Sequence, residues 1–397
     1  MRKIWIKISE VLFFQEGPGV RNTQYTTEGV KLLNVANLVN GKVDLSTSDR
    51  YISKEEAYGK YKHFLCDVGD FIVASSGIKV EYIDKKMGFI DESMLPLCMN
   101  TSTIRFKVLN ENQLRIRYFM YYLKSQHFKR QLAREITGSA QLNYGPSHLK
   151  KMVMPLVDVC IQDKIIRQMD KIQNIIDMRQ QELDYLGTII KARFIELFGT
   201  YPGNEKGWNT GNIRDVVSEV RYGSSRPAVD GGRYPYLRMN NITYGGELDL
   251  SDTKRIDIPD SELAKCTVRH GDVLFNRTNS KELVGKTCVY NRDEMMVLAG
   301  FVIRVRVNEK VLPEFLSAFL NTDFSKKMLL GMCKTAIGQA NINAQELQNI
   351  GLYVPPIDLQ QEFVDFKIQV NKSKVAVQKA LDEAQLLFDS LMQEYFG

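Results

Sequence analysis

Two long stretches of the chain place apolar residues at alternating steps of three and four. The first runs from Ile161 to Phe198 without a proline, and the second from Leu359 to Phe396. This narrow stripe is typical of a coiled-coil helix. A helix of this length is stable only when the stripe is buried, so the sequence predicts that the two helices pack together. The stripe positions are Ile165, Met169, Ile172, Ile176, Leu183, Leu186, Ile190, Leu197, Phe363, Phe366, Val370, Val377, Ala380, Ala384, Leu387 and Leu391.

The two halves of the chain repeat one series of short motifs in the same order. The spacing between motifs drifts by only a few residues, which indicates a tandem duplication. The pairs are LNVANL from Leu33 with LRMNNI from Leu237, GKVDLS from Gly41 with GELDLS from Gly246, VGDFIVASSG from Val68 with HGDVLFNRTN from His270, GSAQLN from Gly138 with GQANIN from Gly338, and a Phe-Gly end to each long helix.

Each half therefore predicts a globular unit followed by a long helix. Residues 71–74 and 273–275 follow Gly-Asp turns and are expected to be strands, and helices are expected over residues 117–135 and 313–327. The predicted fold class is α+β: two similar mixed α/β domains separated by two long helices in an antiparallel coiled coil, with pseudo-two-fold symmetry. The predicted domains are residues 1–157, a central helix at 158–199, residues 200–356, and a C-terminal helix at 357–397.

Composition and charge restrict the class of protein. A chain of 397 residues, 44% hydrophobic and 25% charged, is typical of a soluble globular protein with two or three domains. No apolar run reaches the length of a membrane span and the start lacks a signal-peptide core, so a cytoplasmic protein is expected. The six cysteines and four histidines form no metal-binding spacing, which favours reduced, mostly buried thiols. A net charge of +6 permits nucleic-acid binding without requiring it.

The sequence carries no recognisable catalytic constellation. The run beginning at Tyr353 superficially resembles the Asn-Pro-Pro-Tyr box of amino-methyltransferases, but it lacks the amide and no glycine-rich cofactor loop precedes it. The acid pairs Asp67/Asp70 and Asp252/Asp257 lie beside turn glycines or are spaced as surface residues. We therefore expect a non-catalytic chain with no metal or cofactor of its own. A free-standing DNA methyltransferase or nuclease is the alternative, and a coiled-coil adaptor without a DNA role is a third reading.

Polar loops at matching places in the two halves are candidate DNA contacts. Residues 15–24 correspond to residues 222–231, and residues 75–79 to 276–280, and their side chains suit base edges. The GSAQLN and GQANIN turns are a third candidate, because backbone amides at a helix start can hold phosphates. Each loop can also be an ordinary solvated turn. The candidate DNA-binding residues are Gln15, Arg21, Asn22, Gln24, Ser75, Ser76, Lys79, Tyr222, Ser224, Ser225, Arg226, Asn276, Arg277, Thr278 and Asn279.

This ordered, duplicated set of motifs resembles the specificity subunit of type I restriction–modification enzymes over essentially the whole chain. Trp5 and Trp208, which open the two halves, add to the resemblance. It implies that each globular unit is a target-recognition domain that reads one half of a bipartite double-stranded DNA site. It also implies that the paired helices set the unread spacer and dock two modification (methyltransferase) subunits. S-adenosylmethionine and ATP with Mg²⁺ are then expected on partner subunits, which include restriction (motor-nuclease) subunits that translocate and cut DNA.

Two further expectations concern the ends and the outer faces of the helices. Little sequence precedes Trp5, so the N-terminal segment with which some relatives close a circle is expected to be reduced. Apolar positions outside the two stripes predict a docking surface for helices of the modification subunits. These partner-binding candidates are Ile166, Ile175, Ile189, Phe194, Leu381 and Phe388.

Overall fold

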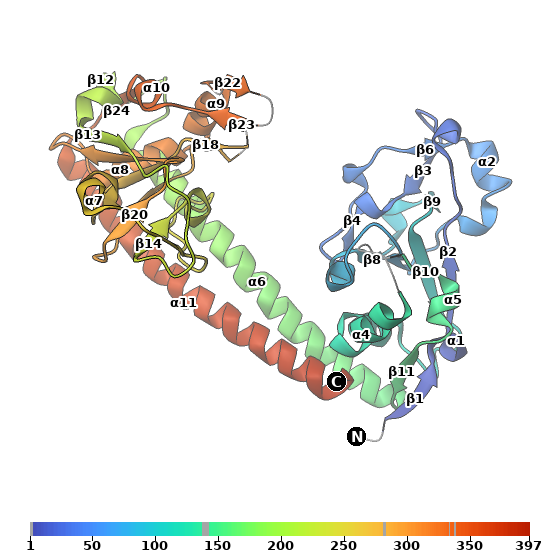
Figure 1. The fold of residues 1–397 in the computed structure, drawn as a ribbon. Helices are drawn as coiled ribbons and strands as arrows, with labels where there is room; N and C mark the ends of the chain where they lie inside the picture. Colours follow the sequence, from blue (N-terminus) through green and yellow to red (C-terminus); the bar gives the residue numbers. More distant parts are fainter. Residues whose placement is uncertain (1–2, 137–142, 281–282, 333, 337–338) are drawn as a thin grey trace. The chain divides into compact units, whose positions relative to one another are not determined.

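The computed structural model describes residues 3–136, 143–280, 283–332, 334–336 and 339–397, and the chain divides into two compact units (Figure 1). Unit 1 contains Met1–Met178 and Leu381–Gly397, and unit 2 contains Arg179–Ala380. Each unit has a globular head and a part of each long helix, α6 (Val159–Phe198) and α11 (Ile357–Phe396). Both predicted long helices are therefore present, and each begins two residues before the stretch expected from the sequence, which started at Ile161 or Leu359.

The head of unit 1 is built on an antiparallel four-stranded sheet with the order β2-β10-β7-β8. A smaller sheet has the order β6-β3-β9, in which β3 and β9 are parallel, and β1 pairs with β11. The strands are β1 (Ile4–Lys7), β2 (Leu12–Glu16), β3 (Val30–Leu33), β4 (Leu38–Val39), β5 (Lys42–Val43), β6 (Tyr51–Ile52), β7 (Phe71–Ala74), β8 (Met87–Phe89), β9 (Leu97–Met99), β10 (Thr103–Val108) and β11 (Val153–Leu156). The shorter helices are α1 (Ile8–Val11), α2 (Lys54–Tyr58), α3 (Ile116–Lys124), α4 (Gln126–Glu135) and α5 (Pro146–Leu149).

The head of unit 2 repeats this design. Its antiparallel sheet has the order β13-β21-β17-β19, its second sheet has the order β15-β14-β20-β16, and β12 pairs with β24. The strands are β12 (Asn209–Asn212), β13 (Val217–Tyr222), β14 (Tyr234–Leu237), β15 (Lys254–Ile256), β16 (Thr267–Val268), β17 (Val273–Asn276), β18 (Thr278–Asn279), β19 (Thr287–Val289), β20 (Met296–Leu298), β21 (Val302–Val307), β22 (Lys334–Ala336), β23 (Gln339–Asn341) and β24 (Gly351–Val354). The shorter helices are α7 (Asp260–Cys266), α8 (Pro313–Asn321), α9 (Asp323–Met332) and α10 (Ala344–Gln348).

The LNVANL and LRMNNI motifs end strands β3 and β14 and hold the turns that follow them. The buried side chain of Asn37 accepts a hydrogen bond from the Asn34 amide and donates one to the Asp44 carbonyl, at 2.9 and 3.1 Å. Asn241 does the same in unit 2, with the Arg238 amide and the Asp249 carbonyl. Each asparagine satisfies backbone groups that the turn would otherwise leave unpaired, which explains why the motif is repeated.

The helix expected over residues 117–135 is wrong as one element: it is two helices, α3 and α4, that meet at Ser125. The hydroxyl of Ser125 accepts a hydrogen bond from the Phe128 amide and so caps α4. In unit 2 the helix expected over residues 313–327 is likewise divided into α8 and α9. Thr322 lies at that junction, where its hydroxyl accepts from the Ser325 amide at 3.3 Å.

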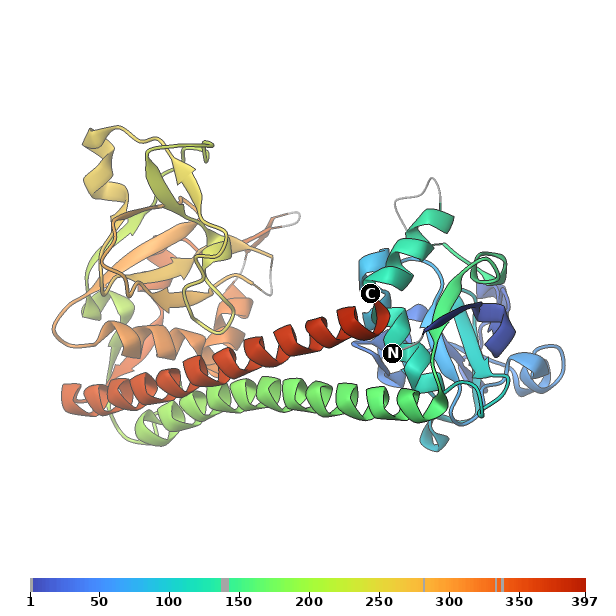
Figure 2. The same ribbon diagram turned by 90° about the horizontal axis from the view of Figure 1, so that it is seen from below.

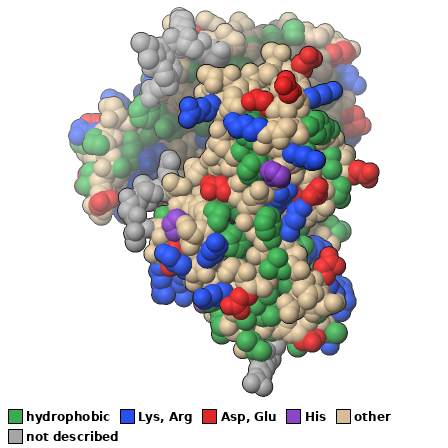
Figure 3. Space-filling model, turned by 90° about the vertical axis from the view of Figure 1, so that its right-hand side faces the viewer, with side chains coloured by type: hydrophobic (Ala, Val, Ile, Leu, Met, Phe, Trp, Pro, Cys, Tyr) green, Lys and Arg blue, Asp and Glu red, His purple; other side chains and the backbone are tan. Residues whose placement is uncertain are grey.

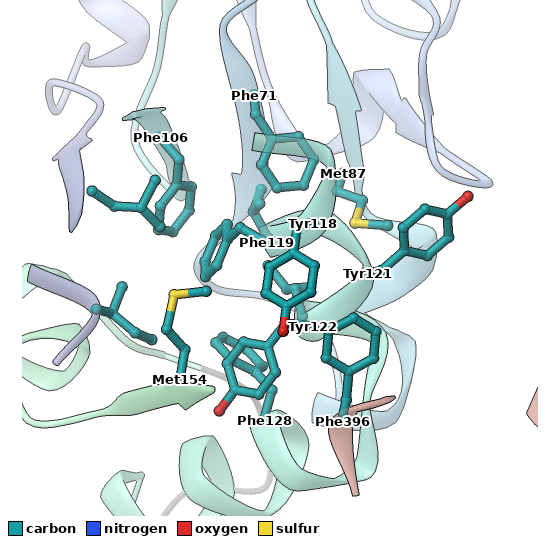
Figure 4. Packing of buried hydrophobic residues seen from close by; sticks show 14 of the residues in the cluster. Phe71, Met87, Phe106, Tyr118, Phe119, Tyr121, Tyr122, Phe128, Met154 and Phe396 are labelled. Atoms are coloured by element: carbon teal, nitrogen blue, oxygen red, sulfur yellow. The ribbon is translucent and has the colours of Figure 1, made fainter. Parts of the chain in front are cut away.

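Each head is sealed by the beginning of one long helix and the end of the other. In unit 1, Phe396 from α11 lies 5.1 Å from Tyr118, between ring centroids, in the aromatic cluster drawn in Figure 4. In unit 2, Phe198 from α6 lies 5.0 Å from Phe315 at the equivalent place on α8. The phenylalanine of each Phe-Gly end therefore lies in a hydrophobic core. The end of α11 contributes to the core of unit 1, and the end of α6 contributes to the core of unit 2.

Within each unit, the parts of the two long helices lie side by side (Figures 1 and 2), and contacts there define their pairing. In unit 1, Tyr395 donates to Gln168 at 2.7 Å, and in unit 2, Arg193 donates to Glu362 at 2.5 Å. The beginning of α6 thus pairs with the end of α11 and the end of α6 with its beginning, which is antiparallel. One stripe position is wrong: Leu387 is 52% exposed, and its neighbour Phe388 packs into the core instead.

A glutamine in the first turn of each long helix ties that helix to its head. Gln162 and Gln360 are both fully buried. Gln162 accepts from the Arg115 amide and donates to the carbonyls of Gln113 and Val157. Gln360 makes the same set of bonds, with the Leu312 amide and the carbonyls of Lys310 and Pro355. Among the helices of the described ranges, none has the length and apolar content needed to cross a membrane.

Candidate nucleic-acid interface

Three segments of unit 2 meet at one end of its main sheet. They are the last residue of β13, the continuation of β17 into β18, and the turn from β23 into α10. The Ile342 amide donates to the Arg277 carbonyl at 2.9 Å, and the Ala344 amide donates to the Tyr222 hydroxyl at 2.8 Å. The guanidinium of Arg277 lies over the Tyr222 ring, 4.8 Å from its centroid. Tyr222 is 42% exposed and Arg277 is half-buried, so the pair lies at the surface.

The same three segments meet in unit 1. The Tyr144 amide donates to the Ser75 carbonyl at 2.9 Å, as Ile342 does to Arg277. The Ser75 amide donates to the Ser102 carbonyl at 2.8 Å, and the Arg277 amide donates to the Phe301 carbonyl at 3.0 Å. Glu16 is paired with Ile104 and Tyr222 with Ile303, at matching places on β10 and β21. Ser75 thus corresponds to Arg277, and Glu16 to Tyr222.

We name these two places by their residues. Edge 1 is Glu16, Ser75, Ser76, Ser102 and Tyr144, and edge 2 is Tyr222, Arg277, Thr278, Phe301 and Ile342. The backbone bonds match but the side chains differ. In edge 1 the Ser75 hydroxyl donates to the Glu16 carboxylate at 3.4 Å, and the Ser76 hydroxyl donates to that of Ser102 at 2.6 Å. In edge 2 the corresponding pair is the arginine stacked on the tyrosine.

The structure brings five of the predicted DNA contacts to the two edges: Ser75 and Ser76 in unit 1, and Tyr222, Arg277 and Thr278 in unit 2. Asn279 continues edge 2, because β18 pairs with β23 through Thr278 with Asn341 and Asn279 with Ala340. The GSAQLN turn lies largely outside the described residues, as does the beginning of GQANIN. The role of all these residues in DNA binding stays a prediction.

The remaining predicted residues of unit 1 divide into exposed and structural side chains. Arg21 and Asn22 are exposed, but Gln24 is held by Glu56 at 2.7 Å and Gln15 accepts from Arg105 at 2.5 Å. Lys79 is exposed and borders a hollow of about 450 Å³. That hollow is lined by Val39, Asn40, Gly77, Ile78, Lys79, Tyr82, Lys85 and Lys86.

In unit 2 the predicted residues 224–226 follow edge 2 along the chain. The Ser224 amide and carbonyl bond to Leu298 and Gly300, both at 2.7 Å, so its backbone extends the smaller sheet. Ser225 is exposed. Arg226 is also exposed, and its guanidinium is paired with Glu262 at 2.7 Å.

The expectation that all these residues lie on open, solvated loops is wrong for four of them. Ser75 and Asn276 are fully buried, Ser224 is 5% exposed and Thr278 is 7% exposed. The cause is backbone pairing, because each of the four lies in a strand or continues one. Asn276 still belongs to β17, paired with Val302, and Ser75 bonds to residues on both sides of it.

The partner-binding candidates on the long helices also divide. Ile166, Phe194 and Phe388 are 8%, 1% and 8% exposed, so their expected exposure is wrong: the heads cover these faces of the helices. Ile175 and Ile189 are 47% and 46% exposed, and Leu381 is half-buried. The helices also expose apolar side chains that the sequence reasoning did not single out, among them Met178, Tyr185, Val375 and Leu386.

Buried ion pairs support the strand behind each edge. In unit 1, Arg105 pairs with Asp70 at 3.1 Å, and both side chains are almost completely buried. In unit 2 the matching Arg304 pairs with Glu219 at 2.8 Å, and Arg306 pairs with Asp272 at 2.8 Å. Burial raises the pKa of Glu219, but its hydrogen bond to Arg221 and the nearby guanidinium charges outweigh burial and lower the pKa overall.

In both acid pairs named in the sequence analysis, at least one carboxylate is paired with a basic side chain. Asp67 pairs with Lys107 at 2.5 Å, and Asp252 pairs with Arg238 at 2.9 Å. Within the described ranges, no group of three or more histidine, cysteine, aspartate or glutamate side chains is placed to hold a metal ion. The described cysteines are free thiols, four of them buried, and burial raises the pKa of Cys98 and Cys288 to about 12.

Sequence reasoning did not single out Glu16, Ser102, Tyr144 and Phe301, which complete the edges. Phe301 is 54% exposed and lies opposite Arg277. A signal was available, because aligning the two halves from the Gly-Asp turn places Ser75 opposite Arg277. The partners of these residues lie far away along the chain, however, and only the register of the strands places them next to one another.

On the face drawn in Figure 3, basic and acidic side chains are interspersed and no continuous basic surface is visible.

Comparison with known families matches both halves. A family model described as the type I restriction modification DNA specificity domain matches residues 8–186 and again residues 205–384. The EcoKI specificity subunit of Escherichia coli K12 is 21% identical over 292 residues, which are 70% of this chain and 63% of that protein. The putative MjaX specificity subunit of Methanocaldococcus jannaschii is 23% identical over 193 residues, 48% of this chain and 45% of its own length. The chain thus spans less than two thirds of the length of these relatives.

Two solved structures have a similar fold along the whole chain. One is the S subunit of a type I restriction–modification system from M. genitalium, with a TM-score of 0.53 and 13% identity, covering 100% of this chain and 96% of that one. The other is described as showing complex assembly and conformational transition of a type I restriction–modification system. Its TM-score is 0.57 with 16% identity, covering 99% of this chain and 97% of that one. At these identities the likeness establishes the fold alone.

Proposed function

Because this chain belongs to the type I restriction–modification DNA specificity family, we propose that it is the DNA-reading subunit of such a complex. Each unit reads one half of a bipartite site in double-stranded DNA. The observation that carries the proposal is the pair of edges: one backbone arrangement, repeated in both units, presents different side chains. Backbone contacts to DNA fix position, whereas differing side chains at a fixed position are what reading two different sequences requires.

The chain itself performs no chemistry in this proposal. Modification subunits bind S-adenosylmethionine and transfer the methyl group, and restriction subunits use ATP and Mg²⁺. The modification subunits pack on the exposed apolar side chains of the long helices, among them Ile175 and Ile189. The alternative of a free-standing methyltransferase or nuclease is tested by incubating the purified chain alone with duplex DNA. Methyl transfer or cleavage without partners would overturn the assignment.

Two double variants test the reading of half-sites. One is Arg21→Ala with Asn22→Ala in unit 1, and the other is Ser225→Ala with Arg226→Ala in unit 2. All four side chains are exposed, so folding is retained. Each chain is co-expressed with the modification subunits of its own host, and methylated sequences are mapped. We expect each variant to relax or weaken recognition in one half of the motif only, and a different half for each. Changes in both halves from one variant would contradict the proposal.

Partner docking has its own test. Ile175→Asp with Ile189→Asp places charges on two exposed helix positions, and we expect the modification subunits to be lost on co-purification. Thr188→Asp is the matched control, because it places a charge on an exposed polar position of the same helix. Phe388 is unsuitable for this test, since a charge there would disrupt the core of unit 1. Retention of a stoichiometric complex by the double variant would count against docking at these positions.

A further inference from the structure

Edge 2 holds an arginine whose guanidinium is oriented but unpaired. The ring of Tyr222 lies 4.8 Å from the guanidinium carbon of Arg277. The Nε atom of Arg277 is buried, and neither it nor the two terminal nitrogens has a hydrogen-bond or ion-pair partner among the described residues. Stacking on an aromatic ring restricts the plane of a guanidinium without using its donors.

Neighbouring arginines in unit 2 differ from Arg277. Arg226 is paired with Glu262, and Arg221 is paired with Glu219. Arg238 is paired with Asp252. Each of these three guanidinium groups is paired with a carboxylate, whereas that of Arg277 has no carboxylate partner among the described residues. An arginine at the surface without a carboxylate partner can donate hydrogen bonds to an acceptor on a bound ligand.

The support of Tyr222 is itself fixed. Its hydroxyl accepts the Ala344 amide at the beginning of α10, and its backbone belongs to β13, paired with Ile303. Arg277 is held by backbone bonds on both sides, to Phe301 and Ile342. Two strands and the beginning of α10 therefore fix the positions of Tyr222 and Arg277. Because the two side chains are already ordered, little conformational entropy is lost when Arg277 binds a ligand.

We propose that Arg277, positioned by Tyr222, reads a guanine in the half-site of unit 2. Two parallel terminal N–H groups match the O6 and N7 acceptors that guanine presents in the major groove, and a bidentate contact of this kind is the commonest specific one. A phosphate also accepts from arginine, but it needs neither a restricted plane nor a buried Nε. This inference rests on the proposed function, because it assumes that edge 2 faces DNA.

Unit 1 cannot make this contact at the equivalent place. Ser75 stands where unit 2 has Arg277, and its hydroxyl donates to Glu16. Glu16 occupies the position of Tyr222, and a carboxylate there would pair with an arginine and occupy its donors. The guanine contact is therefore a property of one half-site only.

The test uses the full chain co-expressed with the modification subunits of its host, and selection of bound sequences from a randomised duplex library. Arg277→Lys keeps the charge but loses the planar fork. We expect one guanine position to become degenerate, with affinity for the original site lower by about 5- to 150-fold and the other positions unchanged. Tyr222→Ala should give a smaller relaxation at the same position, whereas Tyr222→Phe, which keeps the ring, should give less still. Arg292→Lys is the matched control, because Arg292 is exposed at the opposite end of the same sheet.

The outcomes separate the possible roles of Arg277. Arg277→Ala also removes the charge. A uniform loss of affinity across all sequences in this variant, with the salt dependence reduced by about one charge, would identify a phosphate contact and overturn the guanine assignment. Degeneracy at a position other than guanine would overturn it as well. If the unaltered chain selects no sequence at all, the proposed function itself fails. Thermal unfolding of each variant confirms that a changed preference is not a loss of fold.

Discussion

The two heads have the same framework and different edges. Strand order, the Gly-Asp turns, the asparagines Asn37 and Asn241, and the glutamines Gln162 and Gln360 recur with the same hydrogen bonds. At the edges the side chains diverge, from serine and glutamate in unit 1 to arginine and tyrosine in unit 2. Duplication thus preserved the groups that satisfy the backbone and freed those that face outward. The difference indicates which residues position an edge and which determine what it recognises.

The largest predicted effect comes from the buried ion pairs, where the units differ in redundancy. Arg105 has Asp70 as its only carboxylate partner among the described residues, whereas in unit 2 Asp272 and Glu219 share two arginines. Asp70→Ala should therefore lower the free energy of unfolding of unit 1 by about 3–5 kcal/mol, because it leaves a buried charge unpaired.

Asp272→Ala should cost unit 2 less, because Arg304 and Arg306 both retain Glu219. Calorimetry of the full chain measures both. Asp67→Ala is the control for an exposed pair, with an expected loss of up to about 1 kcal/mol. Equal losses for Asp70→Ala and Asp272→Ala would show that the difference in redundancy has no energetic consequence.

The buried glutamines Gln162 and Gln360 test whether the junction between head and long helix is equally important for stability in the two units. Gln162→Leu and Gln360→Leu each leave three backbone groups unpaired, so each should reduce stability by about 1–3 kcal/mol, and by similar amounts. Urea unfolding measures the loss. Gln361→Leu, on an exposed position beside Gln360, should change stability by less than about 0.5 kcal/mol. Clearly unequal effects of the two buried substitutions would break the equivalence of the two junctions.

A further test moves the arginine–tyrosine pair of edge 2 into the equivalent positions of unit 1. Glu16→Tyr with Ser75→Arg places the arginine–tyrosine pair of edge 2 in unit 1. We expect the half-site of unit 1 to gain a preference for guanine at one position, of about 5-fold or more, in a selection from randomised duplexes. Ser75→Arg alone should give no such gain, because Glu16 pairs with the new arginine. A gain from the single variant would show that the aromatic support is unnecessary.

The last comparison concerns one lysine at matching positions of α4 and α9. Lys129 pairs with Asp84 at 3.0 Å, whereas Lys326 donates to the Gly285 carbonyl at 2.6 Å and has no carboxylate partner among the described residues. Burial, with the charges of Lys191 and Lys286, lowers the pKa of Lys326 from 10.5 to about 8. Between pH 8 and 10.5 the unfolded chain thus binds more protons than the folded one at this group, so the stability of unit 2 should rise with pH there.

Lys326→Met should abolish that rise and slightly stabilise unit 2 at pH 7. Lys129→Met should instead cost unit 1 up to about 1 kcal/mol, through loss of its partly exposed ion pair. Thermal unfolding between pH 7 and 10 measures both. A Lys326→Met chain that still gained stability over this range would assign the effect to another group.

Periodicity and repetition predicted the long helices, the α+β class and the strands after the Gly-Asp turns. These features depend on local patterns, which a sequence displays directly. The break at Ser125 was missed because a serine at a helix cap and a serine on a solvated helix face leave the same apolar pattern. The burial of Phe388 in place of Leu387 was missed. Near the end of α11 the head of unit 1, and not the other long helix alone, determines which face of the helix is buried.

The candidate site was only partly visible in the sequence. Tyr222 and Arg277 were identified as separate loop residues, but their contact depends on the register of β13 and β17 against β21. Glu16 was passed over in favour of Gln15, one position away, and that single step moves a side chain to the other face of the strand. Side-chain burial at Ser75 was equally hidden, because its cause lies in residues that are distant along the chain.

The place of Phe396 in the first head has a consequence for synthesis. Residues 381–397 supply part of the core of unit 1, whereas unit 2 is complete once residue 380 has emerged from the ribosome. The head that is translated first must therefore wait, with the ring of Tyr118 uncovered by Phe396, until residues 381–397 have been synthesised. A stop codon placed just before residue 381 should accordingly destabilise unit 1, although it leaves residues 1–178 unchanged.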